Sequence, residues 1–424
     1  MAMSSTMTIR MYNVGFGDSF LLLLPGGKTI LVDAGFHSQG RGAFTANDLA
    51  RQIAADAKAH SGKARIDVVI ATHRHQDHVF AFNSTEWEQV EIGEVWMPWV
   101  EDRNNPDAKK LWKKQQGFAM ALHRAASSFA LLPDQRAELD FLLWNAGMDI
   151  TGLVPDAELA AWSNQGALDV LHDGFKHRQR SDPRFLPEGN DFPETFESNV
   201  ITGMKVHVLG PPRDPDEIEE LDPASDDETY KALMLRAATV LHEEVPAPFS
   251  EQWRVSDTDP GPKLDPGDLE RLKGLAHSAD ALLAAKAVDD MINSTSLVLV
   301  LDIGSARLLL PGDAEWGTWK RILANNKARS LLRGASFFKV GHHGSHNATS
   351  KTLVEKVLPR EIPAMVSTQA GLGRYRNNIP LDELLTALRD HEISCVRSDK
   401  GNELLPDGFV AEANAKWIDL EIAC

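Results

Sequence analysis

A cluster of histidines directly after a predicted strand constrains the fold of this 424-residue chain more than any other segment. Residues 71–78 read ATHRHQDH, and they follow the β-branched run at residues 66–70. Three imidazoles and a carboxylate can converge on one point here, because a loop can turn while the strand fixes where it starts. Neutral imidazoles and carboxylates are the groups that bind Zn²⁺, Mn²⁺ or Fe²⁺. The segment therefore indicates a metal site at the end of a buried strand.

The rest of the chain mixes predicted strands with predicted helices. Short apolar segments bounded by turn residues predict strands over residues 9–14, 19–24, 29–33, 66–71, 200–209, 296–303, 307–310, 336–340 and 393–397. Helical spacing of apolar residues predicts helices over 45–59 and 381–389. This succession of elements is typical of a layered α/β domain.

Two polar, mainly helical segments interrupt the strand pattern, at residues 101–194 and 213–290. Near the end of the first, residues 176–190 are rich in basic side chains and proline, and they are predicted to form a loop. The residues outside both segments number about 250, the size of one α/β domain. We therefore expect a single domain over residues 7–424 that carries both segments as insertions.

Charge and composition limit the classes of partner. The chain has 44 Lys and Arg against 61 Asp and Glu, a net charge of −17, which argues against a broad basic face for duplex DNA. Its two cysteines, Cys395 and Cys424, are too few for a disulfide framework. No apolar run approaches the roughly 20 residues that span a bilayer, and the first residues lack a secretory signal pattern. We expect a cytoplasmic protein without a membrane partner.

Three further segments carry motifs in a fixed order around the histidine cluster. Residues 31–35 read LVDAG, residues 309–313 read LLPGD, and residues 340–345 read VGHHGS. Together with residues 71–78 they resemble the metallo-β-lactamase superfamily, which has an H-x-H-x-D-H signature. The resemblance implies an α/β fold in which two mixed β-sheets and their flanking helices form a four-layer αββα sandwich. The two insertions take no part in it.

Three segments point to one group within the superfamily. Residues 14–19 (VGFGDS), 293–298 (NSTSLV) and 339–345 (KVGHHGS) look like the hydrolase domain of the ComEC/Rec2 DNA-uptake group, which includes stand-alone hydrolases. The chain resembles that hydrolase module only.

The resemblance also implies a site with two divalent metal ions. Zinc is the expected metal, and manganese and iron are alternatives. The ligands implied are His73, His75, Asp77, His78, Asp313 and His342. His73 and His75 would hold one ion. Asp77 and His78 would hold the second, with Asp313 between the two.

The last motif offers two adjacent histidines for one ligand position. We favour His342, because it directly follows Gly341 at the end of the predicted strand. His343, as a catalytic group, and Ser345 would then face the substrate. Asp77 is the other catalytic candidate, because its carboxylate could accept a proton from the attacking water.

One position departs from the superfamily pattern. Many members place a metal-binding histidine where this chain has Asn293, and an amide oxygen is a weaker ligand. Asn293 is therefore a candidate for a third ligand position or for substrate contact. His207 could replace it, although a histidine in an apolar strand is more often structural. We expect Asp33 to orient a metal ligand through a hydrogen bond without binding the metal itself. Asp18 either has the same role or caps its own turn.

Two bridged metal ions would lower the pKa of a shared water and supply hydroxide as the nucleophile. We therefore expect a metal-dependent hydrolase, with a phosphodiester in a nucleotide or a single-stranded nucleic acid as the favoured substrate. One alternative is a metallohydrolase of a lactone, a thioester or a small phosphoester. Another is a non-catalytic or partner-activated metal-binding module. The oligomeric state is left open.

Two features of the first insertion could serve a nucleic acid. Lys109, Lys110, Lys113 and Lys114 form one basic helix face, which is either solvated or phosphate-binding. Six of the ten tryptophans lie in or beside this insertion, and one or two of them could stack on a base.

Overall fold

The computed structural model describes residues 6–37, 40, 42–113, 115, 164–180, 182–220, 228, 289–345, 347–371 and 379–424. The central parts of both predicted insertions, 101–194 and 213–290, lie outside these residues, and so does Lys114 of the basic helix face. Among the described residues, no helix has the length and apolar character needed to cross a bilayer.

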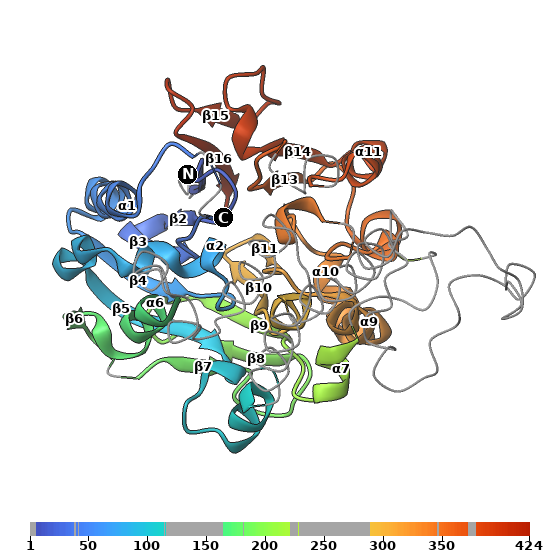
Figure 1. The fold of residues 1–424 in the computed structure, drawn as a ribbon. Helices are drawn as coiled ribbons and strands as arrows, with labels where there is room; N and C mark the ends of the chain where they lie inside the picture. The colour runs from blue at the N-terminus through green and yellow to red at the C-terminus, as the bar shows by residue number, and fades with distance from the viewer. Residues whose placement is uncertain are drawn as a thin grey trace, which may run out of the picture.

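Two β-sheets form the centre of the described structure (Figure 1). The first sheet has the order β15-β16-β1-β2-β3-β4-β5-β6, and β7 also pairs with β5. Its strands are β1 (Thr6–Tyr12), β2 (Phe20–Leu24), β3 (Lys28–Val32), β4 (Arg65–Ile70), β5 (Glu91–Pro98), β6 (His177–Arg178), β7 (Arg184–Leu186), β15 (Phe409–Ala411) and β16 (Trp417–Ala423). The second sheet has the order β14-β13-β12-β11-β10-β9-β8. Its strands are β8 (Glu194–Glu197), β9 (Met204–Gly210), β10 (Val298–Ile303), β11 (Ala306–Leu310), β12 (Phe337–Lys339), β13 (Pro363–Val366) and β14 (Ser394–Arg397).

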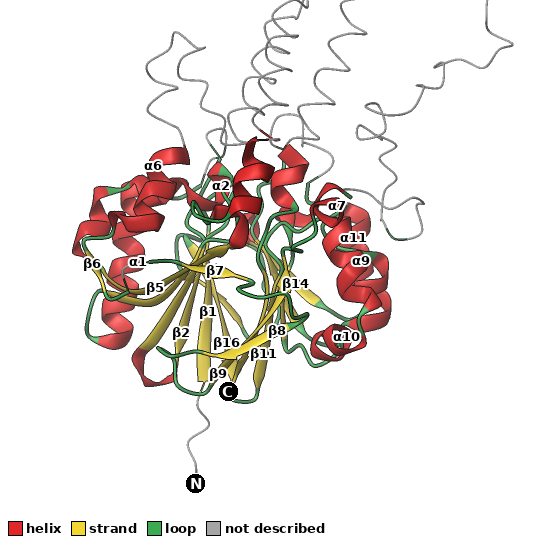
Figure 2. Ribbon diagram, turned by 90° about the horizontal axis from the view of Figure 1, so that it is seen from below, coloured by secondary structure: helices red, strands yellow, loops and turns green. Residues whose placement is uncertain are grey.

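Both sheets are mixed. β1, β2 and β3 are antiparallel to one another, and β3, β4 and β5 are parallel. In the second sheet, β9 to β11 are antiparallel and β11 to β14 are parallel. The helices are α1 (Ala46–Ser61), α2 (Gln76–Val79), α6 (Asn164–Asp169), α7 (Pro215–Glu219), α9 (Trp316–Ala324), α10 (Asn326–Leu332) and α11 (Asp382–Asp390). Figure 2 shows helices outside the two sheets, so the predicted αββα sandwich is confirmed.

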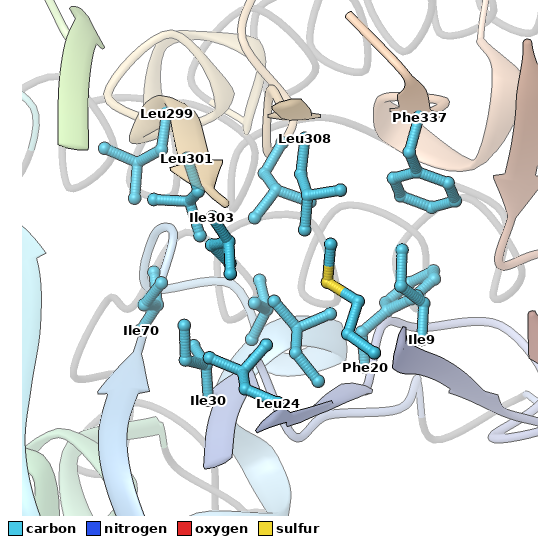
Figure 3. Close-up of a cluster of buried hydrophobic side chains, with 14 of the residues drawn as sticks. Ile9, Phe20, Leu24, Ile30, Ile70, Leu299, Leu301, Ile303, Leu308 and Phe337 are labelled. Atoms are coloured by element: carbon cyan, nitrogen blue, oxygen red, sulfur yellow. The ribbon is translucent and has the colours of Figure 1, made fainter. Parts of the chain in front are cut away.

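The core between the sheets follows from the two-residue period of the strands. In β10, Leu299, Leu301 and Ile303 belong to the cluster that faces the first sheet, whereas Val298 and Val300 pack under the helices of the second. Figure 3 shows Leu299, Leu301 and Ile303 in the same buried cluster as side chains of the first sheet. Each sheet thus buries both faces, which explains why these strands read as continuous apolar runs.

Helix α1 shows how local sequence sets an element's ends. The side chain of Thr45 accepts a hydrogen bond from Asp48 N at the start of the helix, and Gly62 ends it in the left-handed conformation. The predicted helix, residues 45–59, therefore begins one residue before the observed helix and ends two residues before it does.

The loop predicted over residues 176–190 is wrong at two short strands, residues 177–178 and 184–186, and holds for the other described residues. Strands β6 and β7 lie within it, and both run parallel to β5 and extend the first sheet. Their residues lack the alternating apolar pattern of a strand, because an edge strand can be held by backbone hydrogen bonds without burying one whole face. The C-terminal flank of the first predicted insertion is therefore part of the sheet.

The topology places four loops at one end of the sandwich. Strands β3, β4, β11 and β12 are each followed by a loop at the carboxyl end, and parallel strands bring such ends to one edge of a sheet. These loops contain Asp33, the histidine cluster, Asp313 and the His342–His343 pair. The candidate site is therefore expected where the carboxyl ends of the two sheets meet.

We expect Leu299→Ala to lower the free energy of unfolding by about 2–5 kcal/mol, because it leaves a cavity between the sheets. Leu299 is 1% exposed, whereas Val410 is 67% exposed, so Val410→Ala is the matched control, with an expected change within about 0.5 kcal/mol. Urea unfolding measures both values. Equal losses in the two variants would contradict this assignment of the core.

Candidate metal centre

Two glycines allow the loops of the first sheet to pack against the histidine cluster. A Cβ atom on Gly35 would lie 2.3 Å from the backbone N of His78, and one on Gly17 would lie 2.5 Å from Gly35 O. Backbone hydrogen bonds join the same loops, from Asp18 N to Asp77 O (2.8 Å) and from Ala34 N to His78 O (2.9 Å). Only residues without a side chain fit at these two positions.

Asp33 fixes the orientation of His78. Its Oδ1 accepts a hydrogen bond from Thr72 N (2.7 Å), and its Oδ2 accepts one from Thr72 Oγ1 (2.7 Å). The same Oδ2 lies 2.8 Å from Nδ1 of His78. Because that nitrogen faces a carboxylate, Nε2 of His78 is directed toward Asp313, 3.1 Å from its Oδ2. This is the supporting role that the sequence suggested for Asp33.

His343 is held in the same way from the other sheet. Its Nδ1 lies 2.9 Å from Ser367 O, and since a carbonyl oxygen only accepts, Nδ1 must carry the hydrogen. Nε2 therefore points inward, 3.0 Å from Oδ2 of Asp77 and 3.9 Å from Oδ2 of Asp313. The side chain of His343 is fully buried.

His73 and His75 turn their rings toward each other. Nε2 of His73 lies 3.0 Å from Nδ1 of His75, so the two nitrogens face one common point. The other nitrogen of His75 lies 3.3 Å from Asp289. Burial lowers the pKa of His73 well below its usual value, helped by charge on His78 and His75. The imidazole of His73 is therefore neutral, the form that binds a metal.

Three groups of donor atoms meet at the centre, and all of them share His78. Asp18, Asp33 and His78 form one group, and the other two combine residues of the remaining motifs. Of these two, one contains His73, His78 and Asp313, the other Asp77, His78 and His343, and within each group the donor atoms lie within 4.8 Å of one another. All five residues of these two groups are buried. The structure thus brings together His73, Asp77, His78 and Asp313 from the predicted ligand set, with His75 beside them.

The preference for His342 over His343 is corrected by this geometry. His342 lies outside all three groups: its Nδ1 is 3.4 Å from Glu315, and its Nε2 is 3.4 Å from the amide of Asn293. His342 and His343 both have left-handed backbones, with φ of 45° and 53°. This turn brings the second imidazole, not the first, to Asp77. The grouping of His343 with Asp77 and His78 therefore favours His343 over His342 as the candidate ligand, in place of the substrate-facing position assigned to it.

The remaining candidates lie around the centre. Oδ1 of Asn293 is buried and accepts no hydrogen bond within the described part of the chain, which leaves it available to a ligand. Ser345 donates to Asn347 Oδ1 (3.2 Å) and belongs to none of the donor groups. His207 lies in β9 between Asp302 (3.2 Å) and Thr195 (2.9 Å), which fits its structural interpretation.

Sequence reasoning assigned no role to two buried charged groups. Lys339 is fully buried and forms an ion pair with Asp18, so Asp18 does more than cap its turn. Burial disfavours the charged amine, but Asp18 and Asp313 outweigh it and raise the pKa of Lys339. Glu315 is also fully buried and faces His342. The sequence does contain a signal for Lys339, because it lies in an apolar predicted strand and buried lysines are almost always paired.

The charges at the centre favour cations. Four buried carboxylates, from Asp18, Asp33, Asp77 and Asp313, surround His78, and Lys339 is paired with only the first. Burial opposes ionisation of Asp77 and Asp313, yet the nearby histidines hold the pKa of both carboxyls below their usual range. Burial likewise opposes charge on His78, but Asp313, Asp33 and Asp77 raise its pKa well above its usual value. The buried carboxylates thus stabilise a proton on His78, and the same negative charge would stabilise divalent cations.

We expect His343→Ala to weaken zinc binding by at least about tenfold, because it removes a nitrogen aimed at Asp77 and Asp313. His342→Ala is the matched control and should change zinc affinity far less. Isothermal titration calorimetry with Zn²⁺ measures both. A larger loss in His342→Ala would reverse the assignment.

We expect Lys339→Met to lower the free energy of unfolding by about 3–5 kcal/mol, because it leaves the buried charge of Asp18 without its partner. Asp18→Asn in the same chain should recover part of the loss. The exposed Lys356→Met variant is the control for urea unfolding. A loss no larger than the control's would show that the ion pair is not needed for stability.

Comparison with known proteins agrees with the geometry. Residues 12–85 match the family model of the metallo-beta-lactamase superfamily, a stretch that includes Asp33 and the histidine cluster. ComE operon protein 3 of Bacillus subtilis (strain 168) is 29% identical over 142 residues, which cover 32% of this chain and 16% of the relative. The chain therefore matches only a small part of that protein. In motif order, fold and donor geometry, the chain resembles the metallo-β-lactamase superfamily, and within it a ComEC-type hydrolase domain.

Proposed function

We propose that the protein is a metal-dependent hydrolase of phosphodiester bonds in nucleotides or single-stranded nucleic acids. The observation that carries the proposal is the pair of buried donor groups that share His78 and that together contain His73, Asp77, Asp313 and His343. Divalent cations, when bound there, supply Lewis acidity and lower the pKa of water. The resemblance of residues 14–19, 293–298 and 339–345 to the DNA-uptake hydrolases favours the phosphodiester.

The chain's own residues would prepare the centre. Asp33 keeps Nε2 of His78 turned inward, and the Ser367 carbonyl does the same for His343. His73, His75, Asp77, His78, Asp313 and His343 would hold the ions. We propose two ions, with zinc as the first choice and manganese or iron as alternatives.

Asp77 is suited to a second task. Its Oδ2 faces His343, whereas its Oδ1 is buried and has no hydrogen-bond donor among the described residues. The pKa of Asp77 is held below its usual range, so the carboxylate is ionised. We propose that this oxygen orients the attacking water by accepting a hydrogen bond from it.

A cysteine nucleophile is a poor alternative. Burial raises the pKa of Cys395 to about 12, which leaves its thiol protonated at neutral pH. Burial also raises the pKa of Cys424. Both cysteines are in strands or strand ends of the sheets, and neither belongs to the donor groups.

We expect the protein to hydrolyse bis(p-nitrophenyl) phosphate with added Mn²⁺ or Zn²⁺, and EDTA to abolish the activity. Asp77→Ala and Asp313→Ala should each lower kcat/KM by on the order of 100-fold or more. Asp407→Ala, at an exposed turn, is the matched control.

Three results would contradict the proposal. Equal activity of wild type, Asp77→Ala and Asp313→Ala would show that this site does not catalyse the hydrolysis. Hydrolysis of a lactone or thioester without any phosphodiester turnover would assign a different bond. Zinc binding without turnover of any of these substrates would indicate a metal-binding module.

A further inference from the structure

A pocket of about 300 Å³ lies at the base of the first insertion, formed by both of its described flanks. One flank is the turn Trp99–Glu101 with the helical residues 106–113, and the other is α6 with the turn Val170–Gly174. The lining includes Glu101, Arg103, Lys109, Trp112, Lys113 and His172. Its volume is at the small end of ligand pockets and suits one base-and-phosphate unit.

One buried ion pair connects this pocket to the metal centre. Both oxygens of Glu101 accept hydrogen bonds from Arg74, from Nε (2.9 Å) and Nη2 (2.7 Å). Arg74 stands between the ligand candidates His73 and His75 in the sequence. The amide of Asn164 also donates to Arg74 O (3.0 Å). The pocket wall therefore contacts the histidine loop directly.

The helices confirm that the two sites are neighbours. Helix α6, which lines the pocket, packs against α2, which carries Asp77 and His78. Figure 2 shows α6, α2 and α7 at the same end of the sandwich. The pocket therefore lies one helix away from the metal centre.

Most charges in the pocket have a partner. Arg74 neutralises Glu101, Asp169 pairs with Arg103, and Asp102 caps the backbone N–H of Asn104. His172 is neutral at pH 7, because burial and the charge of Arg103 lower its pKa to about 4.

Lys109 and Lys113 differ from these groups. Both are exposed, lie one helical turn apart, and make no ion pair within the part of the chain that the structure describes. In a chain of net charge −17, two such cations at one pocket favour an anionic ligand.

Trp112 adds an aromatic wall of fixed orientation. Its indole N–H donates to Val100 O (2.6 Å), and the guanidinium of Arg74 lies over one face of the ring. Trp112 is also among the residues that line the pocket. An indole beside two lysines offers a nucleic acid both a stacking surface for a base and charge for a phosphate.

We propose that this pocket binds one nucleotide unit of a single-stranded nucleic acid substrate, with its phosphate at Lys109 and Lys113 and its base against Trp112. The choice of nucleic acid as the ligand rests on the proposed function. A strand bound there lies beside the histidine loop, because the buried Arg74–Glu101 ion pair links that loop to the pocket wall. Duplex DNA is excluded, because the base must leave its stack to enter.

The test is fluorescence anisotropy with a short fluorescein-labelled oligothymidylate, measured in EDTA so that no hydrolysis occurs. Lys109→Ala/Lys113→Ala should weaken binding at least about tenfold and reduce its dependence on salt. Lys110→Ala is the matched control, because Lys110 lies on the same helix, pairs with Asp107 and does not line the pocket. Trp112→Leu should weaken binding, and Trp112→Phe should retain most of it. Circular dichroism checks that each variant is folded.

Equal binding by the lysine double variant and Lys110→Ala would overturn the proposal. Competition by polyglutamate as effective as that by unlabelled oligothymidylate would also overturn it, because the pocket would then be a general anion site. Since binding is measured without turnover, the result is independent of phosphodiesterase activity. A chain that binds the strand through these lysines but hydrolyses no phosphodiester supports the pocket and refutes the proposed function.

Discussion

The hydrogen bonds of the Asp33 carboxylate are the interaction on which the candidate site depends. One side chain holds the backbone and hydroxyl of Thr72 and the ring of His78, so it joins the end of β3 to the loop after β4. Asp33 itself has a left-handed backbone, with φ of 56°. That conformation is costly for a residue with a side chain and persists only where the surroundings fix it. Without this contact, His78 would lack the orientation that the donor groups require.

The sequence predicts the architecture and most of the centre for a physical reason. Apolar runs fix the buried strands, and the parallel order of β3, β4 and β5 then brings Asp33 and the histidine cluster to one edge. Asp313 follows in the same way from β11 of the second sheet. These positions depend on strand ends, which a single sequence can indicate.

The parts that could not be predicted depend on tertiary contacts. The choice between His342 and His343 is decided by two consecutive left-handed residues and by the carbonyl of Ser367, which lies 24 positions away. Strands β6 and β7 pair with β5 through their backbones, so their side chains carry little signal. The Lys339–Asp18 ion pair joins residues that lie 321 positions apart in the sequence. No local pattern contains such information.

The donors of the centre come from both sheets: Asp77 and His78 from the first, Asp313 and His343 from the second. Elsewhere the two sheets meet mainly through apolar packing, which is not directional. A cation bound only by the folded chain would add a directional cross-link between the halves and stabilise it by mass action. Both cysteines are free, so no disulfide does this. The candidate metal centre would then also hold the two sheets together.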